Sequence, residues 1–211
     1  MSFLYNSVDG SYFWYHVSRQ KSCVFEKGKG FHSGVAFFMP TLEEILKFTN
    51  TFTETEREND TVTVCKVQIK DGKIFNSSND LLSYEAMDDE LGTSEILQDP
   101  QRNLTPLGLK LVNYLGRYAR RSDDLTVMLY NLLTMYWQSF DPEGRHIYLS
   151  KFVYRFLKRN GFRGWLETEQ PEADGYNANL YEEEINLALI YPEEDVIVIE
   201  STEINIYEQD F

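Results

Sequence analysis

Two segments near the start of the chain combine residue types that could bind a flat, polar ligand. The sequence reads YHVSR over residues 15–19, so His16 and Ser18 come at the end of an aromatic run. Over residues 28–45 it reads GKGFHSGVAFFMPTLEEI, with Phe37 and Phe38 after a glycine-spaced stretch. An imidazole and a hydroxyl can hydrogen-bond a sugar or an amide, and a ring can pack against a flat group. A histidine packed in an aromatic core would give the same pattern, so both interpretations stay open here.

The order of these segments resembles the ADP-ribosyltransferase fold, in its diphtheria-toxin and poly-ADP-ribose-polymerase branch. In that branch a first strand ends in His-x-Ser, as at His16–Ser18, and a glycine-containing segment then leads to an aromatic strand and a helix, as at residues 28–45. The later segments TVTVCKVQIKDGKIF, FLKRNGFRGWLETEQ and EINLALIYPEEDVIVIE resemble the remaining strands. The chain is most similar to the small phage-encoded anti-CRISPR ADP-ribosyltransferases, over roughly the first 75 and last 50 residues.

The resemblance implies an activity and a substrate. It implies that the protein uses NAD, breaks the bond between nicotinamide and ribose, and transfers ADP-ribose to a host macromolecule, with a protein as the expected acceptor. The bond breaks through an oxocarbenium-like state, which a carboxylate stabilises. The implied ligand contacts are His16 for the ribose, Ser18 and the Val17 main chain for the amide, Phe37 or Phe38 for the nicotinamide ring, and Asn186.

The catalytic carboxylate is left open by the same resemblance. Ala36 stands where the polymerase-like enzymes have a tyrosine, and Leu187 stands where they have the catalytic glutamate. Two candidates remain: Glu169, just after GFRG, and Glu184, which begins the next strand two residues before Asn186. Glu169 matches the motif better and has fewer acidic neighbours. The departures also allow a second hypothesis, a binding protein that keeps the fold without the chemistry, and a third, an acidic inhibitor that mimics nucleic acid.

Composition restricts the partners and the compartment. The 211 residues carry a formal net charge of −14, which disfavours direct binding to nucleic acid. We find no signal peptide and no membrane-spanning stretch, so we expect a cytoplasmic protein. Cys23 and Cys65 are the two cysteines, and we expect both to be reduced thiols. The three histidines lack metal-ligand spacing, so we expect no metal site.

Periodicity and capping signals predict a single α+β domain, with a split antiparallel sheet and a helical insertion at about residues 80–160. Thr41 with Glu44, and Thr105 before Pro106, should begin helices, and Gly161 should end one. Residues 76–103 read as loop or short helix, and 184–192 and 196–200 as two buried strands. The middle helices at 104–140, including Arg120 and Arg121, are expected to recognise the target. The expected secondary-structure segments are strands at 11–17, 35–38, 61–70, 161–166, 184–192 and 196–200, and helices from 41, 105, 122 and 150.

Overall fold

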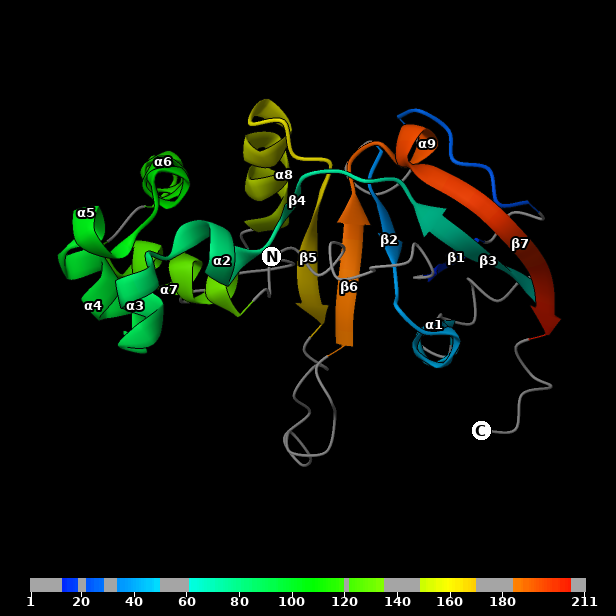
Figure 1. Ribbon diagram of the computed structural model, residues 1–211, viewed down its shortest axis with the longest axis horizontal. Coiled ribbons are helices and arrows are strands. Elements are labelled where there is room, and N and C mark those ends of the chain that lie inside the picture. Colours follow the sequence, from blue (N-terminus) through cyan, green and yellow to red (C-terminus); the bar gives the residue numbers. More distant parts are fainter. Residues whose placement is uncertain are drawn as a thin grey trace.

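The described part of the protein is an α+β structure with two sheets. A computed structural model describes residues 13–18, 22–28, 34–49, 61–119, 122–134, 149–169 and 184–205. One sheet has three strands and the other has four. Figure 1 shows the two sheets beside each other, with most of the helices gathered on the far side of the four-stranded one. The predicted α+β class is therefore confirmed.

The three-stranded sheet is antiparallel and has β3 at its centre. Its order is β1-β3-β7. The strands are β1 (Trp14–Ser18), β3 (Thr61–Ile69) and β7 (Val196–Asn205). Valine and threonine alternate along the start of β3, which is the composition of a strand buried between two neighbours. β1 pairs with β3 so that His16 lies opposite Cys65.

The four-stranded sheet has the order β2-β6-β5-β4. Its strands are β2 (Ala36–Phe38), β6 (Glu184–Leu189), β5 (Gly164–Glu169) and β4 (Ile74–Phe75). The β4–β5 pair is parallel and the other two pairs are antiparallel. The two sheets meet at β1 and β2, where Tyr15 and Met39 exchange main-chain hydrogen bonds of 2.8 and 2.9 Å. This seam brings the two motifs of the N-terminal region together.

Local capping signals start the helices where the sequence predicts. The Glu44 carboxylate accepts a hydrogen bond from the Thr41 amide at 2.9 Å, and the Glu44 amide donates to the Thr41 hydroxyl at 3.1 Å. This capping box begins α1 (Leu42–Thr49), which covers the outer face of the three-stranded sheet through Ile45 and Leu46. Both predicted caps are confirmed, because the Thr105 hydroxyl likewise accepts from the Gly108 amide.

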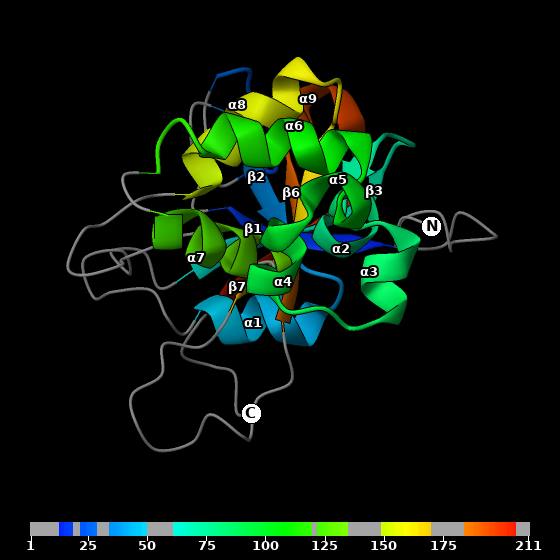
Figure 2. The same ribbon diagram turned by 90° about the vertical axis from the view of Figure 1, so that its left-hand side faces the viewer.

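Among the residues that the structure describes, seven helices lie between β4 and β5 in the sequence and cover the free face of the four-stranded sheet (Figures 1 and 2). They are α2 (Ser77–Leu81), α3 (Tyr84–Asp88), α4 (Thr93–Gln98), α5 (Pro100–Asn103), α6 (Pro106–Leu115), α7 (Ser122–Leu133) and α8 (Leu149–Arg159). Apolar side chains of α2, α4, α6, α7 and α8 share one core with Phe75, Trp165 and Ala188 of the sheet. The helices thus continue the core of the sheet. Residues 76–103, predicted as loop or short helix, form four short helices.

Strand alternation separates the cores on the two faces of β6. Leu187 and Leu189 join Phe38, Trp14 and Cys65 in a cluster between the sheets. Ala188 belongs instead to the cluster under the helices. Successive side chains of a strand point to opposite faces, so this split fixes which residues can meet across the fold.

The link from β6 to β7 passes from one sheet to the other through the short helix α9 (Pro192–Asp195). Arg163 fixes this crossing. Its guanidinium donates to both carboxylate oxygens of Asp195 at 2.9 and 2.6 Å, to Glu194 at 2.8 Å, and lies over the Tyr191 ring. The Arg163 amide also donates to the Lys73 carbonyl at 2.8 Å. Arg163 therefore joins three chain segments, its own and α9 through its side chain and that of Lys73 through its main-chain amide.

The prediction that residues 196–200 form a buried strand is wrong in its burial. β7 is the edge of its sheet, and Ile197, Val198 and Ile199 are 44%, 40% and 49% exposed. An apolar run looks the same in a sequence whether it fills the centre or the edge of a sheet. The register of β7 on β3 also shifts between Lys66 and Val67, where β7 has a bulge.

Candidate functional site

His16 links the two N-terminal motifs through a hydrogen bond. Its Nδ1 lies 2.8 Å from the main-chain carbonyl oxygen of Phe37. A carbonyl oxygen only accepts hydrogen bonds, so Nδ1 carries the proton and donates. In the neutral ring, Nε2 is then an acceptor. His16 can therefore accept a hydrogen bond from a ligand hydroxyl through Nε2, while its other nitrogen fixes the ring.

Burial keeps this imidazole neutral. Desolvation lowers the pKa of His16, and the hydrogen bond to the Phe37 carbonyl opposes the shift in part. A ring whose pKa lies below its ordinary value is uncharged at neutral pH. His16 can thus act as a neutral hydrogen-bonding group and not as a cation.

Two phenylalanine rings surround the imidazole. The ring centroid of His16 is 5.1 Å from that of Phe25 and 5.3 Å from that of Phe38, and the two phenylalanine rings are 5.6 Å apart. Phe38 is fully buried, whereas Phe25 is half-buried in the segment 22–28. The prediction for this region named Phe37 and Phe38 and missed Phe25.

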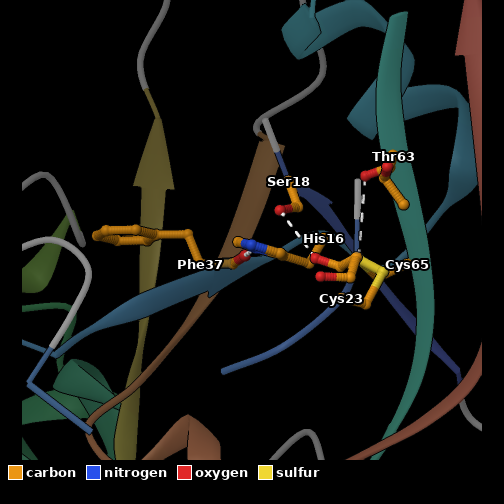
Figure 3. The surroundings of a disulfide bond; sticks show 7 residues. His16, Ser18, Cys23, Phe37, Thr63 and Cys65 are labelled. Carbon is orange, nitrogen blue, oxygen red and sulfur yellow. Dashed lines mark hydrogen bonds between the residues drawn. A yellow bond between two sulfur atoms is a disulfide. The ribbon is translucent and has the colours of Figure 1, made fainter. Parts of the chain in front are cut away.

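Phe37 and Phe38 serve opposite faces of β2, as their adjacency predicts. Phe38 belongs to the cluster between the sheets. Phe37 lies edge-on to Trp165, 6.4 Å between centroids, under the helices. Figure 3 shows the Phe37 ring directed away from His16, although its carbonyl is bonded to that residue. The two rings therefore cannot contact one ligand from the same side of the strand.

A disulfide joins Cys23 to Cys65 beside His16 (Figure 3). The prediction of two reduced thiols is wrong. The Cα atoms are 5.8 Å apart, within the usual span of a disulfide. Cys65 is fully buried at the centre of β3 and is the cross-strand partner of His16. The sequence separation of 42 hides this proximity, because it arises only when β3 pairs with β1 and comes to lie beside the segment that follows β1.

The predicted residues at the end of β1 differ in their surroundings. The Ser18 hydroxyl donates to the Ser22 carbonyl at 3.4 Å. The Val17 side chain packs with the cluster under α1, on the opposite face of β1 from Trp14. Only the main chain of Val17 is thus placed to take part in the predicted amide contact.

Asn186 is buried on the helix-covered side of β6, two residues from Ala188. It is 1% exposed, and its Oδ1 has no hydrogen-bond partner. A buried acceptor without a partner costs about 1–3 kcal/mol, so such an atom marks a position where a donor would bind favourably. Its cross-strand partner on β5 is Glu167.

Leu187 is part of the apolar core between the two sheets. It is fully buried between Leu166 of β5 and Phe38 of β2. No carboxylate therefore occupies this central position of β6. The two candidate catalytic residues, Glu169 at the end of β5 and Glu184 at the start of β6, are partners in the register of these strands.

The structure divides the predicted site into two groups. His16 and Phe38 meet on the inner side, between the sheets. Phe37 and Asn186 lie on the helix-covered side of the four-stranded sheet, by the alternation that also places Ala188 there. The His16–Phe37 hydrogen bond connects the groups through the β2 main chain.

Comparison with known proteins identifies no relative: no family model, curated protein or solved structure matches the chain. Within the described ranges, no three or more His, Cys, Asp or Glu side chains are grouped so that they could hold a metal ion. In the same part of the chain, every helix is too short or too polar to cross a membrane. Arg120 and Arg121 lie outside the described residues.

Proposed function

We propose that the protein is a mono-ADP-ribosyltransferase that takes NAD as its substrate and modifies a host macromolecule, in the manner of a phage anti-defence protein. The observation that carries the proposal is the 2.8 Å hydrogen bond from His16 Nδ1 to the Phe37 carbonyl. It joins the two segments on which the resemblance rests, although they are 21 residues apart in the chain. The meeting of the two sheets at β1 and β2 further supports a split antiparallel sheet.

The proposed reaction needs a hydrogen-bonding group for the ribose and a carboxylate from this protein, and an acceptor atom from the target. The bond between the ribose C1′ and the nicotinamide nitrogen breaks, and its electron pair leaves with nicotinamide. An acceptor atom of the target then forms the new bond to C1′ and loses its proton. In this scheme the Nε2 of His16 accepts from a ribose hydroxyl, and Glu169 or Glu184 stabilises the cationic ribose. The proposed compartment is the host cytoplasm.

Asn186 fits an amide-bearing substrate in chemical terms. Its unpartnered Oδ1 is an acceptor, and the carboxamide of nicotinamide has two N–H donors. Ser18 and the Val17 main chain are the alternative amide contacts at the end of β1. In the proposed scheme, nicotinamide approaches one face of β2 if Asn186 binds its amide, and the other face if Ser18 and the Val17 main chain bind it.

The test is transfer of label from NAD. The protein is incubated with NAD labelled in the adenylate part and with bacterial extract, and labelled macromolecules are separated by gel. We expect wild type to transfer label and His16→Ala to transfer far less. Tyr84→Ala is a matched control, because Tyr84 is 77% exposed on α3 and lies outside the proposed site. Absence of transfer by wild type, together with no shift in melting temperature on adding NAD, would reject the proposal.

A second candidate function has an observation of its own. Leu187 is fully buried where the polymerase-like enzymes have their glutamate, and Ala36 replaces their tyrosine. Both favour a protein that keeps the fold and acts by binding, with its acidic surface as the contact. NAD binding without any transfer or hydrolysis would favour this candidate.

A further inference from the structure

The segment 22–28 is attached beside His16 by a covalent bond and by an aromatic contact. Cys23 is bonded to Cys65 of β3, and Phe25, two residues later, places its ring 5.1 Å from that of His16. The segment forms no helix or strand of its own. Between the two attached residues, Val24 is 60% exposed. The position of Phe25 therefore depends closely on the disulfide.

The two sulfur atoms of the disulfide differ in burial. Cys65 is fully buried, whereas Cys23 is half-buried in an exposed segment. A reductant from solvent reaches the Cys23 side of the bond first. Thiol–disulfide exchange needs in-line access of a thiolate to one sulfur atom. Because Cys23 is the more exposed cysteine, we expect the reductant to attack its sulfur.

We propose that the Cys23–Cys65 disulfide is a redox-sensitive clamp on His16. While the bond is intact, it holds the Phe25 ring against the imidazole. When a dithiol reduces it, the segment 22–28 leaves the sheet, Phe25 leaves with it, and the half-buried His16 becomes more accessible. This inference does not depend on the identity of the ligand that His16 binds.

The chemical step is ordinary exchange with a dithiol reductant. One thiolate of the reductant attacks Sγ of Cys23, the S–S bond breaks, and Cys65 leaves as a thiolate that takes up a proton. The second thiol of the reductant then displaces Cys23 from the mixed disulfide. The products are two protein thiols and the oxidised, disulfide form of the reductant.

Release of the segment leaves the sheets in place. β1 stays paired with β3 over five residues, and Trp14 stays in the cluster between the sheets. After reduction Cys65 is a small apolar side chain in that core. The loss is confined to the contacts of an irregular segment, which is the kind of element that opens locally in proteins.

Accessibility of His16 is measured by its reaction with diethyl pyrocarbonate, in which the unprotonated Nε2 attacks a carbonyl carbon of the reagent and becomes carbethoxylated. The rate at His16 is read from peptide masses in the oxidised and the dithiothreitol-reduced full chain. We expect a several-fold faster reaction after reduction. The NMR pKa of His16, assigned with His16→Gln, should rise towards the ordinary value once the Phe25 ring no longer desolvates the imidazole.

Three variants distinguish the effect of the Phe25 ring on His16 from the effect of the Cys23–Cys65 disulfide. Cys23→Ala should react like the reduced protein whether or not reductant is present. Phe25→Ala should react fast with the disulfide intact, and Val24→Ala, which alters an exposed neighbour, should behave as wild type. Tryptophan emission is followed throughout, because Trp14 and Trp165 are almost fully buried and would report global unfolding.

Several results would overturn the clamp. One is an unchanged rate and pKa of His16 after two thiols have been titrated in the reduced protein. A second is a pair of free thiols in protein prepared under air and denatured without reductant, because the disulfide would then not form. A third is a red shift of tryptophan emission on reduction, which would mean that the whole fold opens and not one segment.

Discussion

Glu169 and Glu184 are direct partners across the antiparallel pair β5 and β6. The sequence does not decide which of these two residues is the catalytic carboxylate. The register shows that they lie opposite each other on neighbouring strands. A pair of acidic residues opposite each other in a sheet repels and lowers stability.

The first prediction concerns this pair. Glu169→Gln and Glu184→Gln should each raise the free energy of unfolding by a few tenths to about 1 kcal/mol, because each removes a cross-strand repulsion. The catalytic member should also lose label transfer by orders of magnitude while NAD binding is kept, since the carboxylate acts mainly in the transition state. Urea unfolding, NAD-dependent melting and label transfer give the three readings. Full activity in both variants would remove the pair from the mechanism.

The second prediction concerns pH. The pKa of His16 is lower in the folded protein than in the unfolded chain, so the unfolded chain binds a proton first as pH falls. The contribution of His16 is fully present above the ordinary histidine pKa of about 6.5 and is lost as pH falls from there towards the folded value. Urea midpoints should therefore fall more steeply with acid in wild type than in His16→Gln. Parallel curves would show that His16 titrates alike in both states.

The third prediction concerns global stability. A cross-link between cysteines 42 residues apart restricts the unfolded chain, and loop-closure arguments assign it about 4 kcal/mol. Reduction should lower the urea midpoint of wild type accordingly. Cys23→Ala should show the lower midpoint with or without reductant. Equal midpoints for oxidised and reduced wild type would mean that the unfolded chain is not restricted in this way.

The fourth prediction concerns Gly164 of the GFRG segment. A Cβ at Gly164 would overlap the Ala188 carbonyl of the neighbouring strand, so no larger residue fits without moving β5 from β6. Gly164→Ala should cost about 1–3 kcal/mol by overpacking. Gly116→Ala at the end of α6 is the control, because its φ of −55° suits alanine and a Cβ there would come no closer than 3.3 Å to the Val112 carbonyl, so it should cost clearly less than Gly164→Ala. Equal melting temperatures for wild type and Gly164→Ala would show that the strands separate without cost.

Local signals in the sequence predict the helices well. The Thr41–Glu44 box, the Thr105 cap and Gly161, with a φ of 76° after α8, each act within a few residues. Such interactions depend on neighbours in the chain, so the chain alone displays them. The start of β3 is equally clear from its β-branched composition.

Long-range pairing is what the sequence does not display. β6 and β7 are separated by only one short helix, yet they belong to different sheets, because Arg163 fixes the crossing on α9. The Cys23–Cys65 bond and the contact of Phe25 with His16 also join segments whose proximity depends on the whole topology. Of the predicted site, the sequence correctly places Phe37 and Phe38 on opposite faces. It gives no sign that Asn186 and His16 lie on different sides of the four-stranded sheet.

The bulge in β7 bears on how this acidic protein avoids self-association. Ile197, Val198 and Ile199 form an exposed apolar run on an edge strand, which is the composition that recruits further strands into fibrils. Ile199 is the extra residue of the bulge, which breaks the regular spacing of main-chain donors and acceptors at the end of the run. Exposed Glu200 and Glu203 follow at once and act as charged gatekeepers. The edge therefore lacks the flat, uncharged template on which aggregation grows.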